Sequence, residues 1–351
     1  MATRNIIVIG ASAGGFEALK KLVANLPKDF AASLFIVWHM SPDIRGVLPQ
    51  VLNRSETIHA AHAFDGESIA PNRIYVAPPD RHLLIEEGRV RVTRGPKENR
   101  FRPAVDPLFR SAAYVYNNRV IGVILSGALD DGTAGLWTVK HRGGLAIVQD
   151  PADADVPSMP ENASREVEID YSVPVSEMAD LLVRLSNEQI EEIPEVVMEN
   201  DEKTEIEIRI AADGSAFESG VMKLGELSPF TCPDCHGVLS TIRDGKRLRF
   251  RCHTGHAFSA DSLLSTVTEN IEDSLYSAIR GVEESIMLLN HLGDHFAEVN
   301  QTKLAAMYFK KANEAQTRAQ MVRQVVLSHE QLSKDSLWQQ AEETNGDKAP
   351  N

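Results

Sequence analysis

A serine, a histidine and an aspartate, Ser12, His39 and Asp131, each follow a short apolar run of the sequence. A serine hydroxyl attacks a carbonyl carbon only when a neighbouring base removes its proton. Histidine is the most common base, and an aspartate orients the imidazole in a catalytic triad. The three residue types therefore predict nucleophilic catalysis if the fold brings them together. Ser12 would be the nucleophile, His39 the general base and Asp131 the orienting acid.

The apolar runs predict neighbouring strands of a parallel sheet. Short runs without alternation suit strands that are buried on both faces. A stretch with helical spacing, residues 16–23, separates the first two runs, and this order indicates a doubly wound, mostly parallel α/β domain. Functional side chains gather at the carboxyl ends of the strands in that architecture. The runs are Ile6–Ile9, Leu34–Trp38, Ile74–Ala77, Val120–Leu125 and Leu145–Val148, and a hairpin is expected at His82–Val92.

The residues of the expected triad have structural interpretations as well. A histidine at a strand end is often structural, and an aspartate before a helix often caps it. The glycine-rich turn Gly10–Gly15 around Ser12 also suits a phosphate loop, because a helix N-terminus favours negative charge. Its glycine spacing departs from the dinucleotide-binding pattern, and no acid for a ribose follows the second run. In the catalytic interpretation, the backbone N–H of Ala13 is a candidate oxyanion donor.

Composition excludes several classes of protein. The 351 residues include 36 Lys and Arg against 50 Asp and Glu, a formal net charge of -14. This acid excess argues against binding to nucleic acid, and no apolar run of about 18 residues predicts direct membrane insertion. The N-terminus lacks the features of a signal peptide, and three cysteines make no disulfide framework. We therefore expect a cytoplasmic protein.

Composition also changes along the chain. Residues 188–207 contain nine acidic residues and one lysine, which is typical of a solvated linker. Beyond residue 263, apolar residues recur at three- and four-residue steps in two series with Gly293 between them, which predicts two long helices. The expected segments are a catalytic domain (1–186), an acidic linker (187–227), a zinc-ribbon-like module (228–262), a helical hairpin (263–338) and a disordered tail (339–351).

Several separated motifs occur along the first half of the sequence. They are Ile9-Gly10-Ala11-Ser12-Ala13-Gly14-Gly15, Trp38-His39-Met40, Tyr75-Val76-Ala77-Pro78-Pro79-Asp80-Arg81-His82-Leu83, Arg102-Pro103-Ala104-Val105-Asp106, Leu125-Ser126-Gly127 with Asp131-Gly132, and Gln149-Asp150 with Met159-Pro160. By these motifs and their order, residues 5–185 resemble the catalytic domain of the chemotaxis protein-glutamate methylesterases, the CheB family.

The resemblance implies an esterase that hydrolyses glutamyl methyl esters on chemoreceptor-type proteins and releases methanol, with no cofactor for catalysis. Ser12, His39 and Asp131 match the family's triad, and deamidation of glutamines is an implied second activity. The loop at Ala128 is a second expected source of oxyanion donors. The sequence departs from the family at Ala128-Leu129, where Met-Gly is usual.

The resemblance also implies partners and a mode of control. Methylated chemoreceptor-type proteins are the expected partners, with a methyltransferase or other sensory-pathway proteins as further candidates. Family members commonly carry an N-terminal receiver domain, whereas here the esterase motifs begin within the first ten residues. We therefore expect a standalone enzyme that is constitutive or controlled by its C-terminal half. The alternative is a catalytically weak adaptor or scaffold that acts through its zinc ribbon and helical hairpin.

Cysteine and histidine residues cluster in the third segment. Cys232 and Cys235 form a C-x-x-C pair, and Cys252 and His256 follow across a short expected hairpin. Two pairs of ligands at this spacing predict a tetrahedral, structural zinc site. His253 is the rival for the fourth position; His256 is preferred because similar sequences appended to standalone esterases show a Gly-His pair. Thiols without metal are the remaining alternative.

Overall fold

The computed structural model describes residues 2–39, 46–191, 201–245 and 247–330, together with residues 332 and 337. The chain divides into two compact units, Met1–Leu263 and Leu264–Asn351. Across the described ranges, no helix has both the length and the apolar character that a membrane crossing requires.

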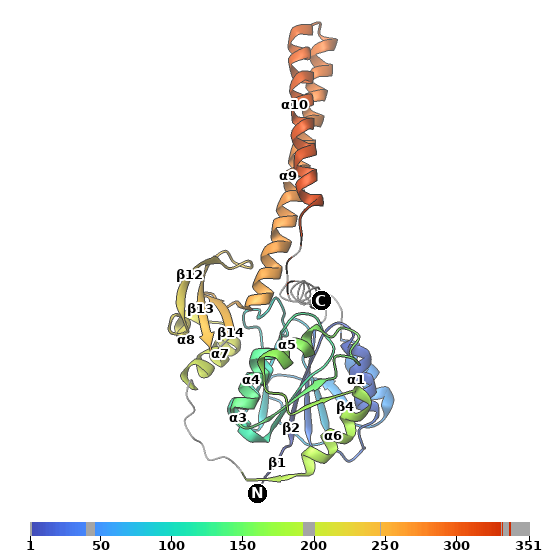
Figure 1. Cartoon of the computed structure of the whole chain (residues 1–351), viewed down its shortest axis with the longest axis vertical. Helices are drawn as coiled ribbons and strands as arrows, with labels where there is room; N and C mark the ends of the chain where they lie inside the picture. The colour runs from blue at the N-terminus through green and yellow to red at the C-terminus, as the bar shows by residue number, and fades with distance from the viewer. Residues whose placement is uncertain are drawn as a thin grey trace, which may run out of the picture. The chain divides into compact units, whose positions relative to one another are not determined.

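Seven parallel strands form the central sheet of the first unit, in the order β10-β9-β8-β2-β3-β5-β4 (Figure 1). All five predicted runs are strands of this sheet, and the predicted doubly wound fold is confirmed. The two edge strands, β4 and β10, were not predicted because they are short and only partly apolar. The strands are β2 (Ile6–Ala11), β3 (Ser33–Trp38), β4 (His59–His62), β5 (Arg73–Val76), β8 (Val120–Ile124), β9 (Leu145–Gln149) and β10 (Tyr171–Val173).

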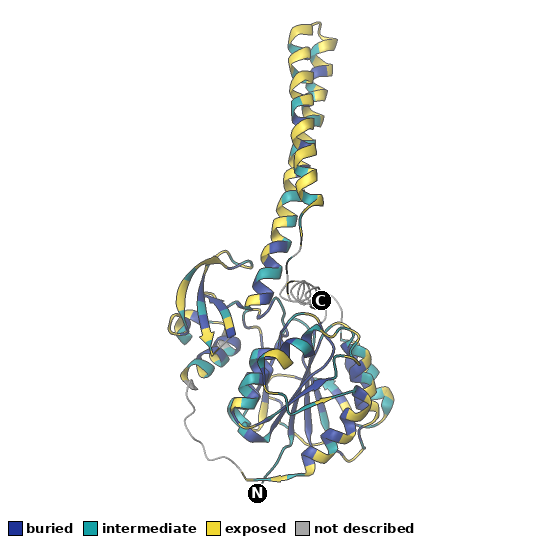
Figure 2. Ribbon diagram, in the orientation of Figure 1, coloured by how far each residue is buried: buried dark blue, intermediate teal, exposed yellow. Residues whose placement is uncertain are grey.

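Helices cover both faces of this sheet, so its five inner strands are buried on both sides (Figure 2). Successive side chains of a strand point to opposite faces. Ile7 and Ile9 of β2 therefore pack in the core with α1, α2 and α6, whereas Ile6 and Val8 pack in the core with α3, α4 and α5. The helices are α1 (Gly15–Ala24), α2 (Leu48–Leu52), α3 (Val105–Tyr116), α4 (Thr133–His141), α5 (Ser158–Glu166) and α6 (Val175–Asn187).

Short elements complete this domain. The predicted hairpin is present as β6 (His82–Glu86) and β7 (Arg89–Thr93), and its apolar side chains join the core beneath α3. Gly88 adopts the left-handed conformation that the turn requires, with φ 71°. The remaining elements are the antiparallel pair β1 (Ala2–Thr3) and β11 (Gln189–Ile190), and the 3-10 turns η1 (Asn53–Ser55) and η2 (Asn117–Arg119).

Residues 201–259 form a second, smaller part of the first unit, which we call the ribbon module. An antiparallel sheet of four strands, in the order β12-β13-β14-β15, packs beside α7 and two short turns. Its apolar clusters are small: one has six buried residues, and the other has five together with Leu263 of α9. The elements are α7 (Asp201–Asp213), α8 (Ala216–Ser219), η3 (Val221–Lys223), β12 (Glu226–Thr231), β13 (Val238–Asp244), β14 (Arg247–Cys252) and β15 (Ala257–Ser259).

The ribbon module corrects the expectation of an acidic linker over 187–227. Residues 201–227 are structured, and Ile206 and Ile210 of α7 are buried in an apolar cluster with Ile242. Glu207 is buried as well, because arginine side chains surround it. Residues 192–200 of the expected linker lie outside the described residues.

The second unit contains most of the predicted helical hairpin, formed by α9 (Ala260–Glu298) and α10 (Thr302–Leu327). An ion pair joins Glu283 to Arg323, and the rings of Phe296 and Tyr308 stack near the turn. Contacts that advance along α9 retreat along α10, so the two helices are antiparallel. The expected tail, 339–351, lies outside the described residues.

Gly293 does not separate the two helices, contrary to the prediction. It lies inside α9, which continues to Glu298. A Cβ atom at Gly293 would lie 2.6 Å from Cε1 of Phe309 on α10. The glycine therefore makes room for an aromatic ring of the partner helix.

Candidate active site and metal centre

The fold brings Ser12, His39 and Asp131 together at the carboxyl ends of three adjacent strands. Ser12 follows β2, His39 follows β3, and Asp131 lies between β8 and α4. In the sheet, β2 lies between β3 and β8. Ser12 Oγ lies 3.2 Å from His39 Nδ1, and His39 Nε2 lies 2.8 Å from Asp131 Oδ2. Both distances are within the range of hydrogen bonds at a nucleophile and its base. The three predicted side chains thus form one continuous chain of contacts.

A main-chain hydrogen bond and a stacked aromatic ring fix the position of His39. Its backbone N–H donates to Ala11 O at 3.0 Å, which fixes the main chain at the end of β3. The ring of Phe101 stacks on the imidazole, with 3.8 Å between centroids and 10° between planes. His39 is buried, whereas Ser12 is half-buried and accessible to a substrate. With Nδ1 facing the serine, the resting base needs its proton on Nε2, which then donates to Asp131.

Asp131 is buried and accepts several hydrogen bonds. Its carboxylate accepts from the backbone N–H of Val105 at 2.6 Å and from Asn99 Nδ2 at 2.9 Å, in addition to His39. Burial raises the pKa of Asp131, but the hydrogen bond and the charge of His39, together with the other donors, outweigh it and lower the pKa below its usual value. The carboxylate is therefore ionised at neutral pH, with hydrogen bonds to both of its oxygens.

Asp131 also binds the start of a helix, although not the one suggested by its place in the sequence. The following helix, α4, has Gly132 at its N-cap and receives no side-chain cap. The carboxylate of Asp131 instead accepts the backbone N–H of Val105, the first residue of α3, and the helix dipole there favours a negative charge. Asp131 therefore links His39 to the start of α3.

Two further residues at this site were not predicted from the sequence. They are Phe101, on the ring of His39, and Asn99, whose Nδ2 donates to both Asp106 and Asp131 at 2.9 Å. Burial and the charge of Asp131 raise the pKa of Asp106 to about 7, so an amide donor between the two carboxyl groups reduces their repulsion. Both residues lie in a loop without a strand or helix pattern, and no sequence signal marked them.

The backbone beside Ser12 is compatible with the predicted oxyanion donors, Ala13 and Ala128, whose role stays a prediction. Ala13 and Ala128 are exposed, and their backbone N–H groups have no partner within the described part of the chain, whereas that of Gly127 donates to Val156 O at 3.0 Å. A Cβ at Gly127 would lie 2.9 Å from Ser12 Cβ and 2.4 Å from Met159 Sδ, so only glycine fits beside the serine.

Leu129, the departure from the family pattern, has a backbone suited to glycine. Its φ is 62°, in the left-handed region where a side chain is strained. Ser158 Oγ accepts the N–H of Leu129 at 3.1 Å, and Asn162 Nδ2 donates to its carbonyl at 3.2 Å. Contacts with α5 thus hold the loop in the conformation that glycine would adopt freely.

Four residues of the ribbon module form a candidate metal centre. The ligand atoms of Cys232, Cys235, Cys252 and His256 all lie within 4.8 Å of one another. Cys235 Sγ lies 3.7 Å from Cys252 Sγ, and His256 Nδ1 lies 3.7 Å from Cys232 Sγ. A tetrahedral zinc with Zn–S bonds of about 2.3 Å separates its sulfur ligands by about 3.8 Å. The four residues therefore fit a tetrahedral ion.

The surroundings of the cluster also suit a metal. Thr254 Oγ1 lies 3.1 Å from Cys235 Sγ and 3.0 Å from Cys252 Sγ, where its hydroxyl can donate to thiolate ligands. His253, the rival ligand, is exposed and not part of the cluster, and His236 is exposed as well. The Cys3His cluster thus agrees with the preferred ligand set and could bind a metal.

A parallel α/β sheet with serine, histidine and aspartate at adjacent strand ends is typical of hydrolases that act on carboxyl derivatives. A family model described as CheB methylesterase matches residues 7–182 of the chain. A protein of Leptospira interrogans, provisionally named protein-glutamate methylesterase/protein-glutamine glutaminase, is 39% identical over 187 residues, which are 53% of this chain and 97% of that protein. The chain belongs to the CheB methylesterase family, whose members are carboxyl-ester hydrolases.

Other relatives agree with this membership. The protein-glutamate methylesterase/protein-glutamine glutaminase of Thermotoga maritima is 36% identical over 184 residues, 51% of this chain and 54% of that protein. The crystal structure of the Thermotoga maritima CheB methylesterase catalytic domain matches with a TM-score of 0.50 and 35% identity. It covers 53% of this chain and 100% of that domain. The similarity is therefore confined to about the first half of the chain.

Proposed function

We propose that this protein is a protein-glutamate methylesterase that hydrolyses glutamyl methyl esters on chemoreceptor-type signalling proteins. The observation that carries the proposal is the contact of His39 with both Ser12, at 3.2 Å, and Asp131, at 2.8 Å. The names of the relatives supply the substrate class. We place the reaction in the cytoplasm, which agrees with three cysteines that are free thiols.

The reaction begins when Ser12 Oγ attacks the ester carbonyl carbon and His39 Nδ1 takes its proton. Negative charge develops on the carbonyl oxygen, which would accept hydrogen bonds from the N–H groups of Ala13 and Ala128. The ionised carboxylate of Asp131 stabilises the imidazolium that forms. The bond from carbon to methoxide then breaks, and His39 returns its proton to the methoxide, releasing methanol.

The second half of the reaction repeats these steps with water. His39 takes a proton from a water molecule, whose oxygen attacks the glutamyl ester of Ser12. The bond to Ser12 Oγ breaks, the serine recovers its proton from His39, and the glutamic acid side chain that is released loses its own proton to solvent. The same steps on a glutamine side chain release ammonia, which is the second activity named for the relatives.

We further propose that the Cys3His cluster binds zinc with a structural role. A bound zinc would hold the turns of the ribbon module together. Such support matters here, since the small apolar clusters of this module bury little surface. All four ligand positions belong to the protein, so no position is left for a substrate.

The experiment that tests the proposed function is methanol release from methylated chemoreceptor. We expect Ser12→Ala to lower the rate about 10⁴-fold or more, because the nucleophile is lost. Ser186→Ala, which removes a buried hydroxyl from α6, serves as the matched control and should keep the wild-type rate. A wild-type rate in Ser12→Ala would overturn the triad. If wild-type protein itself released no methanol, that result would favour the adaptor function.

A further inference from the structure

Backbone hydrogen bonds join the ribbon module to the domain built on the seven-stranded sheet, which we call the sheet domain. The N–H of Asn99 donates to Ala257 O of β15 at 2.8 Å, and the N–H of Ala257 donates to Lys97 O at 3.2 Å. The N–H of Ser259 donates to the side-chain oxygen of Asn99 at 2.8 Å. Strand β15 therefore pairs with the loop 98–102, which comes from a distant part of the sequence.

The loop 98–102 contacts both residues that activate the serine. Asn99 Nδ2 donates to Asp131 Oδ1 at 2.9 Å, and the ring of Phe101 stacks on His39. The same short loop thus holds the general base by one side chain and the orienting acid by another. A shift of this loop would move both partners of Ser12 at once, and small misplacements of such groups strongly reduce rates.

The contact from Ser259 determines how the amide of Asn99 is oriented. An amide has an oxygen that only accepts and a nitrogen that only donates. Because the Ser259 N–H occupies the oxygen, the nitrogen faces the carboxyl groups of Asp106 and Asp131. Asn99 also has a φ of 48°, which asparagine tolerates better than most residues. Residue type and backbone are therefore both matched to this bridge.

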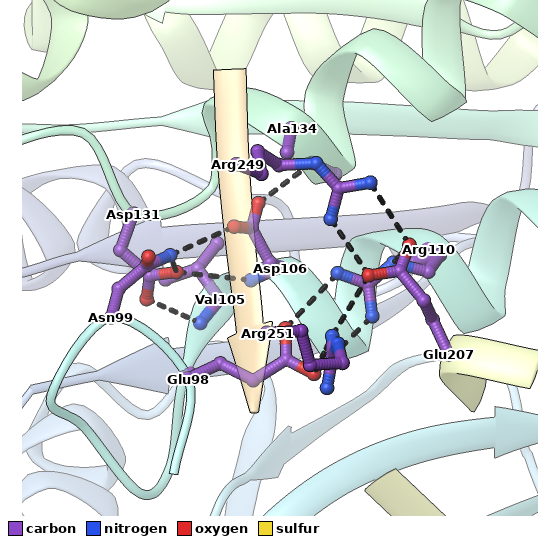
Figure 3. A network of polar contacts seen from close by, with 12 residues as sticks. Glu98, Asn99, Val105, Asp106, Arg110, Asp131, Ala134, Glu207, Arg249 and Arg251 are labelled. Carbon is purple, nitrogen blue, oxygen red and sulfur yellow. Dashed lines mark hydrogen bonds and ion pairs between the residues drawn. The ribbon is translucent and has the colours of Figure 1, made fainter. Parts of the chain in front are cut away.

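Buried charges hold the loop and the module together (Figure 3). Arg251 of β14 is fully buried and donates to Glu98 and to Glu207, each at 2.8 Å. Arg110 of α3 contacts the same two carboxylates, at 3.0 Å and 3.5 Å, and Arg249 pairs with Glu207 at 2.7 Å. Glu98 directly precedes Asn99, so this network fixes the start of the loop.

The candidate metal ligands flank the residues that make these contacts. Arg251 directly precedes Cys252, and its guanidinium donates to Gly255 O at 2.9 Å. His256 directly precedes Ala257, and its carbonyl accepts the N–H of Cys252 at 3.0 Å. An ion that joins Cys252 to His256 would therefore hold together the turn from which β15 begins.

We propose that the ribbon module positions the catalytic pair His39 and Asp131 through the loop 98–102, with Asn99 as the positioning residue, so that metal binding at the Cys3His cluster sets the reactivity of Ser12. This inference rests on the proposed function only in requiring an active Ser12; it does not depend on the identity of the ester. The ribbon module is then a part of the active-site scaffold rather than an attached domain.

The first test measures hydrolysis of a small activated ester, p-nitrophenyl acetate, by the full chain. Asn99→Ala should lower kcat about 10- to 100-fold with KM unchanged, because Asn99 positions the triad without touching substrate. Asn118→Ala removes another buried amide, one that donates to Glu191 O at 2.8 Å, and should keep the wild-type kcat. Equal kcat values for Asn99→Ala and wild type would overturn the proposal.

Asn99→Asp separates positioning from packing. The variant has nearly the same shape, but it places an oxygen opposite two carboxyl groups, so it should lose more activity than Asn99→Ala at pH 8. Protonation restores an O–H donor, so the ratio of its kcat to that of wild type should rise as the pH is lowered. A purely structural role predicts milder loss in Asn99→Asp than in Asn99→Ala and a ratio independent of pH, which would contradict the proposal.

The second test removes the metal and uses two readouts. The chain is treated with a zinc chelator or changed by Cys235→Ser, with His253→Ala as the control that keeps all four ligands. We expect metal loss to raise hydrogen exchange in residues 97–102 but not in β2, and to slow labelling of Ser12 by a fluorophosphonate at least tenfold. Unchanged exchange and labelling without metal would overturn the coupling. If even wild type failed to label, the proposed function would fail, while the exchange measurement would still test the coupling.

Discussion

The sheet domain and the ribbon module of the first unit are stabilised in different ways. The sheet domain buries two large apolar clusters, one on each face of its sheet, and its inner strands are buried (Figure 2). The ribbon module has two small apolar clusters, and its largest buried side chain is that of Arg251. A segment this small buries little apolar surface, so charge pairs and the candidate metal site supplement its core.

This difference has a consequence for how each region tolerates change. Apolar cores accept substitutions of similar volume, whereas a buried charge that loses its partner is costly. The strands that precede Ser12 and His39 are supported by the first kind of interior, and the loop 98–102 by the second. The variants below test each kind of support, from the largest expected effect to the smallest.

Asp131→Asn should have the largest effect on activity. An asparagine cannot provide two acceptor oxygens to the donors from His39, Asn99 and Val105. The imidazole would lose the partner that fixes its tautomer, and kcat should fall about 10⁴-fold. Ester hydrolysis under saturating substrate measures this, with Asp65→Asn as the control, since Asp65 lies away from the site and accepts the N–H of Val92 in β7. A loss below about tenfold would contradict the assignment of the orienting acid.

Arg251→Met should have the largest effect on stability. The change leaves Glu98 and Glu207 buried with one fewer positive partner. Breaking a buried network in this way costs about 3–5 kcal/mol in the free energy of unfolding. Arg209→Met removes an exposed pair with Glu205 on α7 and should change it by less than about 0.5 kcal/mol. Thermal unfolding by calorimetry compares the two, and equal stabilities would show that the network contributes nothing.

The three residues of the proposed triad could be predicted from the sequence, because the signal for each lies in the residues next to it. Ser12, His39 and Asp131 each follow a run of apolar residues, so the sheet topology alone brings them together. Asn99 and Phe101 could not be predicted, because β15, a strand more than 150 residues away in the chain, holds their loop. Glu207 was expected to be solvated, since a run of acids indicates exposure when its arginine partners are distant in sequence.

The pH dependence of stability should distinguish two buried acids, Asp130 and Glu98. Burial raises the pKa of Asp130 to about 8, from a usual value of 3.8, and the nearby Asp261 carboxylate also raises it. Burial also acts on Glu98, but Arg110 and Arg251 lower its pKa to about 2. Glu98 is therefore ionised in the neutral range, whereas folded protein keeps a proton on Asp130 that unfolded protein releases.

The stabilising effect of that proton is complete below about pH 4 and is lost as the pH rises through about 8. The melting temperature should therefore be higher at pH 5 than at pH 8, and the difference should become smaller in Asp130→Asn. Thermal unfolding of both proteins in matched buffers measures it. The same pH dependence in the variant would assign the effect to other groups.

Leu129→Gly should have the smallest effect. Glycine removes the strain of a leucine at φ 62°, worth about 1 kcal/mol, but increases the entropy of the unfolded chain. The net gain in stability should stay below about 1 kcal/mol, with activity within about threefold of wild type. Leu129→Ala keeps the strain and is the matched control. A clear loss of stability in Leu129→Gly would show that contacts of the leucine side chain matter more than its backbone.

The position of Asp131 at the start of α3 has a further consequence for control of the enzyme. Helix α3 is part of the sheet domain's core, so the carboxylate is preorganised as soon as that core folds. A large displacement of this acid would require disruption of the helix, at the expense of the whole domain, whereas the loop 98–102 can adjust the orientation of the carboxylate through Asn99. Reversible adjustment is therefore confined to groups outside the core, namely the ring that lies against His39 and the amide that bridges the two acids. Evolution could then tune turnover through the second half of the chain while the fold of the first half stayed constant.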